Sequence, residues 1–356
     1  MTQNVIEHKP SKLPFAVLIA ACLATIVTVP MIGAGHVGWA DIRTGLSGNA
    51  TVPGQIFWQV RVPRLLLGML AGSALAAAGV AFQSLFRNPL ASPFTLGVAS
   101  GAGLGAALAM SLAGTWTLLG SGWAVSAAAF LGAMGSVLIV YGLAGVRRGF
   151  SSNTLLLAGV SIGFVCSAMI LLIQYLSSQA VTNATIRWLM GSVDPLTGYE
   201  AFTYSLPLVL VGLAILVWHW REMDLLMMGD LVAAGRGVNV RRARRWIYFS
   251  ASVMVAAVVA QTGPIAFVGL VVPHLVRMAV GPTHGRLLPG ALLGGAIFLP
   301  VCDVVAANGM RWLSPSATAA AQLSALSIPV GVLTSLIGGV FFLGMLLGRR
   351  SEAPIL

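Results

Sequence analysis

The stretch Thr262–Gly281 reads TGPIAFVGLVVPHLVRMAVG, and its pattern decides how the rest of the chain is interpreted. It is apolar enough to lie in lipid, but Gly263, Pro264, Gly269 and Pro273 interrupt any regular helix. Interrupted backbone at membrane depth is tolerated only where it packs inside protein or lines a cavity. The residues alone leave two interpretations open. One is a kinked packing helix, because glycine and proline are common in membrane helices; the other is the wall or gate of a transport pathway.

The composition indicates a membrane protein. The 356 residues are 58% hydrophobic and 8% charged, with a mean hydropathy of +0.92, whereas soluble domains carry about 25% charged residues. At about 20 residues per span, we expect an all-α membrane protein with about ten transmembrane helices. They form one transmembrane domain, 13–348, between polar tails at 1–12 and 349–356. The expected helices are residues 13–33, 61–83, 93–112, 122–144, 153–178, 199–219, 242–262, 267–280, 286–306 and 329–348.

The positive charges indicate how the chain is oriented. The net charge of +11 comes from lysines and arginines at the ends of apolar runs, which is typical of membrane topology rather than of nucleic-acid binding. With the amino terminus inside, fourteen of the 20 basic residues lie on the cytoplasmic side and five lie outside. The run Leu13–Ile32 is longer than the core of a cleaved signal peptide. We therefore expect a retained first span and both termini in the cytoplasm.

The longest cytoplasmic loop, Arg221–Arg245, reads REMDLLMMGDLVAAGRGVNVRRARR. A short amphipathic run, Leu225–Ala234, is followed by a glycine turn and five arginines. Asp224 and Asp230 fall near the starts of possible short helices, where acids suit the helix dipole. Two interpretations remain open: a topology-setting loop that rests on lipid headgroups, or a docking helix for a cytoplasmic partner.

The chain lacks the usual signatures of an energy-converting enzyme. Lysine occurs only at Lys9 and Lys12, so the sequence has no GxxxxGKS or GxxxxGKT phosphate loop. Asp303 is the main ionisable candidate deep inside a span, whereas ion-coupled transporters usually keep several such relays. We expect a transport subunit that is not an enzyme, holds no cofactor or metal, and borrows its energy from another subunit. An ion-coupled secondary transporter or channel is the alternative, and a membrane scaffold is a third.

Four blocks of sequence resemble a known family. The chain is similar, from about residue 55 to 348, to the FecCD-type permease subunits of binding-protein-dependent ABC importers for iron chelates, haem and vitamin B12. The blocks are Arg61–Arg64 (RVPR) with Gln83, Arg87–Gly101 (RNPLASPFTLGVASG), Leu155–Ile162 (LLLAGVSI) with Arg187–Ser192 (RWLMGS), and Gly263–Arg277 (GPIAFVGLVVPHLVR) with Gly281–Pro289 (GPTHGRLLP).

The resemblance implies a type II ABC importer permease with ten helices in the lipid of a bacterial inner membrane. Such permeases work as a pair, either a homodimer or two close homologues, with the transport path between them. Two copies of a separate ATPase, which bind ATP and Mg, are expected on the cytoplasmic side. A periplasmic substrate-binding protein is expected outside, and the cargo is expected to be an iron siderophore, haem or cobalamin.

The resemblance also assigns residues. The segment Leu225–Val238 matches the family's ATPase-coupling loop, with expected contacts at Leu225, Met228, Gly229, Asp230, Ala233, Gly235, Arg236 and Gly237. Arg61, Arg64 and Arg311 are expected to dock the binding protein; lipid-headgroup anchoring is the alternative for the first two. The fifth helix is expected to line the path. Pathway and gate positions are expected at Phe150, Ser151, Asn153, Gly159, Ser161, Gly163, Met169, Gly269, Pro273 and His274.

The sequence departs from the family pattern near its end. Asp303 leads into a longer outer loop, expected at Val304–Ser327, which displaces Arg311 from its usual short distance. Ser327 stands where the family has a glutamate, and Val340 replaces a proline near the last helix. These departures suggest an unusual partner or substrate.

Overall fold

The computed structural model describes residues 13–33, 35, 37–46, 51–113, 122–146, 152–193, 198–312 and 328–348, and this part of the chain is helical without a β-strand. Seven helices within it are long and apolar enough to cross a membrane. Three shorter apolar helices, Val98–Leu112, Val268–Val280 and Val330–Met345, bring the number in the described residues to ten. The prediction of an all-α membrane protein with about ten spans is confirmed.

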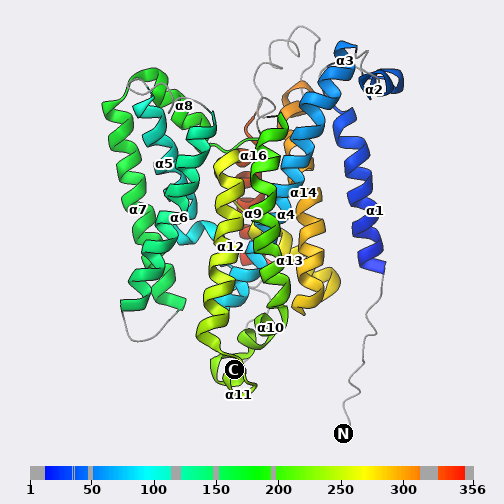
Figure 1. Ribbon diagram of the computed structural model, residues 1–356. Helices are drawn as coiled ribbons and strands as arrows, with labels where there is room; N and C mark the ends of the chain where they lie inside the picture. Colours follow the sequence, from blue (N-terminus) through cyan, green and yellow to red (C-terminus); the bar gives the residue numbers. More distant parts are fainter. Residues whose placement is uncertain are drawn as a thin grey trace.

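Four helices form the centre of the molecule: α4 (Val62–Phe86), α12 (Val240–Thr262), α13 (Val268–Val280) and α14 (His284–Trp312) (Figure 1). They approach closely because small residues face one another. A methyl group on Gly72 of α4 would collide with the backbone of Gly295 in α14, and one on Gly79 would collide with Gly269 in α13. Small residues at membrane helix contacts let backbones approach in this way.

A second group of helices lies beside this centre. It contains α5 (Val98–Leu112), α6 (Gly122–Val146), α7 (Ser152–Leu176) and α8 (Gln179–Leu189), which occupy the left of Figure 1. The 3-10 turn η3 (Pro93–Leu96) leads into α5. Glycines again set the contacts, since α5 and α6 meet where a larger residue would strike the opposite backbone.

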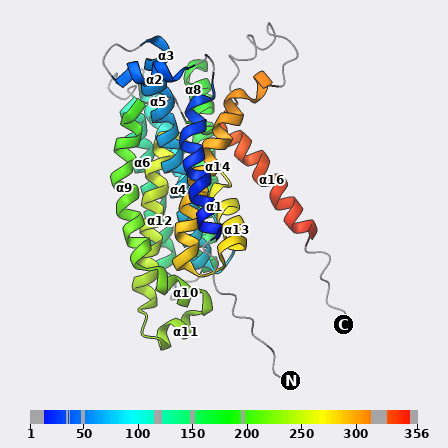
Figure 2. The same cartoon turned by 90° about the vertical axis from the view of Figure 1, so that its right-hand side faces the viewer.

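Three helices cover the outside of these groups. They are α1 (Leu13–Thr28), continued by η1 (Val29–Met31), α9 (Gly198–Trp218) and α16 (Val330–Gly348). Figure 2 shows α16 inclined away from the bundle, and Leu336, Val340, Leu343 and Leu347 along it are exposed. The first residue of α1 and the last residue of α16 point toward the same end of the molecule, as an even number of spans requires.

Short helices mark the two ends of the molecule (Figures 1 and 2). One end carries α2 (Trp39–Leu46), α3 (Val52–Ile56) and α8, with the π-helical turn η2 (Phe57–Arg61) joining α3 to α4. The opposite end carries α10 (Trp220–Met228) and α11 (Asp230–Gly235), which follow α9 directly. We call the second pair the hairpin.

The prediction of a long loop from Val304 is wrong for its first nine residues. Helix α14 continues to Trp312, six residues past the expected end at 306, so Arg311 lies in its last turn. Nothing in residues 304–312 breaks a helix, and the Asn308 side chain donates to the Val304 carbonyl oxygen at 3.0 Å. Residues 313–327, including Ser327, lie outside the described part. The amphipathic helices α2 and α8 were also not expected.

Candidate functional site

The break in regular helix within Thr262–Gly281 is buried among other segments. Helix α12 ends at Thr262, Gly263 takes a positive φ of 67°, and α13 begins at Val268 after Phe267, which has a φ of 66°. Two other segments hold it. The Ser192 amide donates to the Thr262 carbonyl oxygen at 2.7 Å, and the preceding residue, Gly191, accepts a bond from the Gly331 amide at 3.0 Å.

The break in the helix is therefore a three-way junction of backbone, which we call the glycine junction after Gly191, Gly263 and Gly331. A side chain on any of the three would meet a neighbouring carbonyl oxygen, since their backbones are in contact. The junction joins the end of α8, the α12–α13 connection and the start of α16. These segments come from separate blocks of the sequence, and the junction brings them into backbone contact.

The gate residues expected on α13 have different surroundings. Gly269 is buried against Gly79 of α4, and Pro273 is buried inside α13. His274 is half-buried, with its ring edge-on to Phe341 of α16 at 5.5 Å between centroids. Gly269 and Pro273 thus lie in packed contacts, and His274 lies between α13 and the inclined α16.

The pathway residues expected on α7 fall on two faces of that helix. Gly159 is buried beneath Gly97, and Gly163 lies near Ser100, so both face η3 and α5. Ser161 is exposed, with its hydroxyl donating to a carbonyl of its own helix at 2.9 Å, and Met169 is also exposed. Asn153 lies in the first turn of α7, while Phe150 and Ser151 lie outside the described residues.

The exposed face of α7 carries a row of large apolar side chains. Leu157, Phe164, Leu171 and Tyr175 recur at spacings of seven, seven and four, and the Tyr175 side chain is 86% exposed. Residues at such spacings share one side of a helix. This row, which we call the α7 face, has no partner within the described part of the chain.

The expected ATPase-coupling loop is the hairpin. Gly229, with a φ of 117°, separates α10 from α11. Leu231 is 91% exposed at the tip, with Met228 exposed beside it. Among the other predicted contacts, Gly235, Arg236 and Gly237 are exposed, Leu225, Gly229 and Asp230 are half-buried, and Ala233 is buried. The hairpin therefore exposes apolar side chains and Arg221, and Arg236 is exposed directly after it.

Ion pairs at Asp230 and hydrogen bonds at Asp224 hold the inward side of the hairpin. Asp230 Oδ1 accepts from Nη2 of Arg87, the residue after α4, at 3.0 Å and from Arg244 Nη2 of α12 at 2.7 Å. Asp224 Oδ1 accepts from the His284 amide at 2.9 Å and lies 2.6 Å from His284 Nδ1. Sequence reasoning placed both acids at helix starts but found none of these partners. The only signal was the presence of acids in an otherwise basic loop.

Three arginines expected to dock the binding protein meet at the opposite end. Arg61, Arg64 and Arg311 line one cavity of about 310 Å³ together with Asp303. Arg64 forms a fork with Asp303, with Nε to Oδ2 at 2.6 Å and Nη2 to Oδ1 at 2.9 Å. Arg61 donates to the carbonyl oxygens of Pro30 at 3.0 Å and of Gly35 at 2.9 Å. We call Arg61, Arg64, Arg311 and Asp303 the outer arginine cluster.

Within the outer arginine cluster, one carboxylate faces three guanidinium groups. Arg64 is neutralised by Asp303, which is buried, and Arg61 holds the connection after α1. Arg311 is half-buried and also lines a neighbouring cavity with Trp39 of α2. The extension of α14 past Asp303 brings Arg311 to the same cavity in spite of its displacement in the sequence.

A buried polar contact joins α13 to α4. Arg277 Nη2 donates to Gln83 Oε1 at 2.7 Å, and Gln83 Nε2 donates to the Gly269 carbonyl oxygen at 3.4 Å. Both residues lie in the blocks that carry the family resemblance, but nothing in the sequence indicated that they contact each other. The contact fixes α13 against the inner half of α4.

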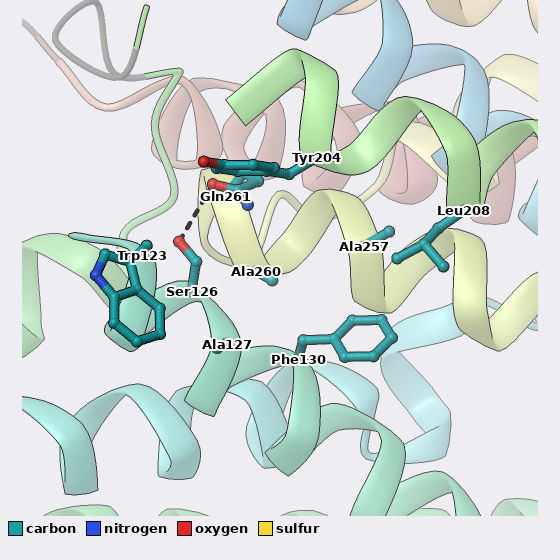
Figure 3. Close-up of a pocket in the computed structure, with 9 residues that line it drawn as sticks. All are labelled: Trp123, Ser126, Ala127, Phe130, Tyr204, Leu208, Ala257, Ala260 and Gln261. Carbon is teal, nitrogen blue, oxygen red and sulfur yellow. Dashed lines mark hydrogen bonds between the residues drawn. The ribbon is translucent and has the colours of Figure 1, made fainter. Parts of the chain in front are cut away.

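A pocket of about 400 Å³ lies between α6, α9 and α12 (Figure 3). Trp123, Phe130 and Tyr204 border it, and Ser126 Oγ donates to Gln261 Oε1 at 3.2 Å near one end. None of the residues expected along the path lines this pocket. Helix α9, which contributes Tyr204 and Leu208 to the pocket, lies on the side of the molecule away from α16 in Figure 2.

Comparisons with known proteins agree with this architecture. The model of the FecCD transport family matches residues 17–348. The chain is 37% identical over 314 residues to the cobalamin import system permease protein BtuC of Halobacterium salinarum, covering 88% of this chain and 78% of that protein. It is 34% identical over 341 residues to the hemin transport system permease protein HmuU of Yersinia pestis, covering 94% and 97%.

A solved structure gives the same answer. It is described as an inward-facing conformation of a metal-chelate type ABC transporter, and the two chains superpose with a TM-score of 0.79 at 30% identity, covering 95% of this chain and 99% of that one. The family match extends over nearly all of the described helices. This multi-pass membrane protein therefore belongs to the FecCD transport family, whose members are permease components of ABC transporters.

Proposed function

We propose that this chain is the membrane-spanning subunit of an ABC importer that carries an iron chelate, haem or cobalamin across a bacterial inner membrane. Two copies of a separate ATPase bind ATP and Mg and supply the energy. This chain is not an enzyme and holds no cofactor. The proposal rests on family membership and on the two ends of the molecule, which present two different kinds of surface.

The observation that supports this proposal best is the exposed tip of the hairpin. Leu231 and Met228 project from a segment in which Asp224 and Asp230 are hydrogen-bonded to the bundle. Exposed apolar residues on a rigid support are typical of a protein contact. The neighbouring Arg236 is exposed as well. In this proposal the hairpin docks on the ATPase at the cytoplasmic end, where most of the arginines lie.

The outer arginine cluster is the proposed contact for a periplasmic binding protein. Its three arginines and one aspartate leave an excess of positive charge around a cavity. Charged groups at a rim steer the encounter with a partner of opposite charge and set its orientation. Because Arg61 and Arg64 have contacts within the chain, Arg311 is the member of the cluster best placed to meet an acidic side chain of the partner.

The transport path is proposed between two copies of this chain, or between it and a close homologue. The α7 face and α16 are both apolar and poorly covered. A second permease against them would enclose a path lined by α7, with Ser161, Met169 and His274 near it. Transport then proceeds by alternating access: closure of the ATPase pair pushes the hairpins, and the packed helices tilt to exchange an outer for an inner opening.

The similar proteins indicate the class of cargo. The similar proteins are named for the transport of cobalamin, hemin and vitamin B12, and the similar structure for that of metal chelates. We propose haem and cobalamin as cargo on that ground, and iron siderophore from the resemblance to the iron-chelate permeases of the family. The aromatic and methionine side chains of α7 offer flat apolar contacts to any of the three.

Uptake by the complete complex tests the proposal. The chain is purified with its partner ATPase and binding protein, reconstituted in liposomes, and supplied with each labelled cargo. We expect uptake of one of them only with ATP and binding protein together. A Leu231→Asp variant should lose the ATPase on co-purification, whereas Val52→Asp, equally an exposed apolar position but at the outer end, should keep it. Uptake without ATP, or normal ATPase retention by Leu231→Asp, overturns the proposal.

A further inference from the structure

Helices α4 and α14 form one unit that crosses the whole molecule. Gly72 and Gly295 bring the two backbones into contact, and Ser73 Oγ donates to the Leu292 carbonyl oxygen across the same interface at 2.9 Å. At 1.5 Å per residue, the 29 residues of α14 extend over about 43 Å. Close-packed interiors transmit displacement because they compress little. We call these two helices the α4–α14 pair.

The outer end of the α4–α14 pair is clamped by an ion pair. Arg64, in the first turn of α4, forms its two-bond fork with Asp303, which lies nine residues before the end of α14. Two-bond contacts of this kind add fixed geometry to the charge interaction. Both residues belong to the outer arginine cluster. The α4–α14 pair therefore ends at the surface proposed for the binding protein.

The inner end of the α4–α14 pair is attached to the hairpin in two places. Arg87, which follows the last residue of α4 in a left-handed conformation, donates to Asp230 of α11. His284 is the first residue of α14. Its backbone amide donates to Asp224 Oδ1 of α10, and its ring nitrogen Nδ1 is hydrogen-bonded to the same oxygen. Each helix of the pair thus holds a different helix of the hairpin, and Figures 1 and 2 both show α10 directly beneath the core.

We propose that Asp224 and Asp230 are positioning residues that fix the hairpin to the α4–α14 pair, so that displacement of the hairpin moves the outer arginine cluster. This inference rests on the proposed function and names the route by which the ATPase end and the binding-protein end communicate. The physical basis is one closely packed pair of helices, with the Arg64–Asp303 ion pair at its outer end and, at its inner end, the Arg87–Asp230 ion pair and the hydrogen bonds between Asp224 and His284. Coupling between distant sites requires an element that both sites can bias.

The chain supplies a matched control for these contacts. Glu222 lies on α10 two residues before Asp224, and its carboxylate is 3.4 Å from His219 Nε2, within the same turn of chain. This pair does not connect the hairpin to α4 or α14. Removing Glu222 changes the charge of the hairpin as much as removing Asp224 does, but leaves both attachments in place.

Asp224→Ala and Arg87→Gln each break one attachment, and Glu222→Ala is the control. The measurement is the number of ATP molecules hydrolysed per cargo molecule imported by the reconstituted complex, together with ATPase co-purification and binding-protein docking. We expect both variants to assemble and dock as the wild type does, while the ATP cost per import rises about 2-fold to 30-fold. The Glu222→Ala complex should keep the wild-type ratio. The double variant should exceed either single variant.

This design distinguishes a failure of the proposed function from a failure of the proposed transmission route. If the wild-type complex fails to couple ATP hydrolysis to uptake, the proposed function fails. If it couples normally and both variants keep the ratio of Glu222→Ala, the transmission route is overturned while the function stands. Should Asp224→Ala fail to assemble, Arg87→Gln decides alone, because it breaks the contact to the other helix of the pair.

Discussion

Helices α4 and α7 invite comparison because they are so similar in sequence terms. Each has 25 residues, each is apolar enough to span a membrane, and neither carries a charged residue in its central part. Their surroundings are opposite. In the apolar stretch of each span, 78% of the residues are buried for α4 and 17% for α7.

The difference follows from the size of the side chains. Helix α4 contains the run GMLAGSALAAAG, whose glycines let α13 and α14 approach to backbone contact. Helix α7 has glycines only on the side facing η3 and α5, and its other side carries Leu157, Phe164 and Tyr175. Hydropathy therefore locates a span, whereas the distribution of small residues tells which spans are enclosed by others.

Among the substitutions that test the difference between α4 and α7, one at Gly72 should have the largest effect. Gly72→Leu places four carbon atoms where the Gly295 backbone lies, and forcing the helices apart should cost more than about 3 kcal/mol. We expect loss of the monodisperse peak in detergent size-exclusion chromatography. Gly135→Leu on α6 is the matched control, because no heavy atom lies within 4 Å of the added Cβ. Equal yields of the two variants would contradict the close packing of α4 on α14.

The ion pair at the outer end of α4 should give the next largest effect. Asp303→Asn leaves Arg64 without its counter-charge in a partly buried site. Breaking a fully buried pair costs about 3–5 kcal/mol, and the partial exposure of Arg64 should reduce this to about 2–3 kcal/mol. The measurement is thermal unfolding in detergent. Arg187→Gln, which removes an exposed charge at the same end of the molecule, should leave the midpoint unchanged, and an equal shift in both variants would argue against the pair.

Much of the fold could be predicted from the sequence, for reasons visible in single segments. Runs of about 20 apolar residues decide where the chain crosses, so the ten spans were expected close to their observed positions. The shortness of α13 was expected as well, because glycine and proline precede it. The amphipathic α8 was not, since eleven residues of mixed polarity resemble a loop. The extension of α14 was missed because a departure from the family pattern was interpreted as a loop.

The partners of charged residues could not be predicted from the sequence. Arg64 and Asp303 are 239 residues apart, and Arg87 and Asp230 are 143 apart. Each is a single charge beside apolar spans, and nothing local selects one partner among several arginines. Asp224 and His284 are no easier, because their contact depends on how α10 folds back beneath α14. The role of the hairpin was expected from the family pattern, but its attachments required the packed structure.

Cysteine cross-linking should show whether a second copy covers the α7 face. We introduce one cysteine at a time, as Phe164→Cys, Leu171→Cys and Tyr175→Cys, and oxidise the protein in membranes. The native cysteines are buried. If two copies meet along α7, at least one position should give a disulfide-linked dimer on a non-reducing gel, without a change in thermal stability. Leu138→Cys, exposed on α6, is the control, and dimers at that position alone would place the contact elsewhere.

The smallest effect is expected from Leu157→Ala, which makes the comparison between the helices quantitative. Leu157 of α7 is 69% exposed, whereas Leu75 of α4 is 1% exposed. Leu75→Ala leaves a cavity that the packed helices cannot close, at a cost of about 2–5 kcal/mol. At position 157, lipid or detergent fills the space, and lipid chains are as apolar as leucine. Leu157→Ala should therefore change the unfolding free energy by no more than about 0.5 kcal/mol.

The unfolding free energies of both leucine variants, measured in one detergent, show how much the burial of each side chain contributes to stability. A loss of stability at Leu157 as large as that at Leu75 would mean that something in the isolated protein already covers the α7 face. The obvious cover is a second copy, and the loss would then depend on protein concentration. A loss that is independent of concentration would instead place Leu157 in the core of the single chain and contradict the exposure of α7.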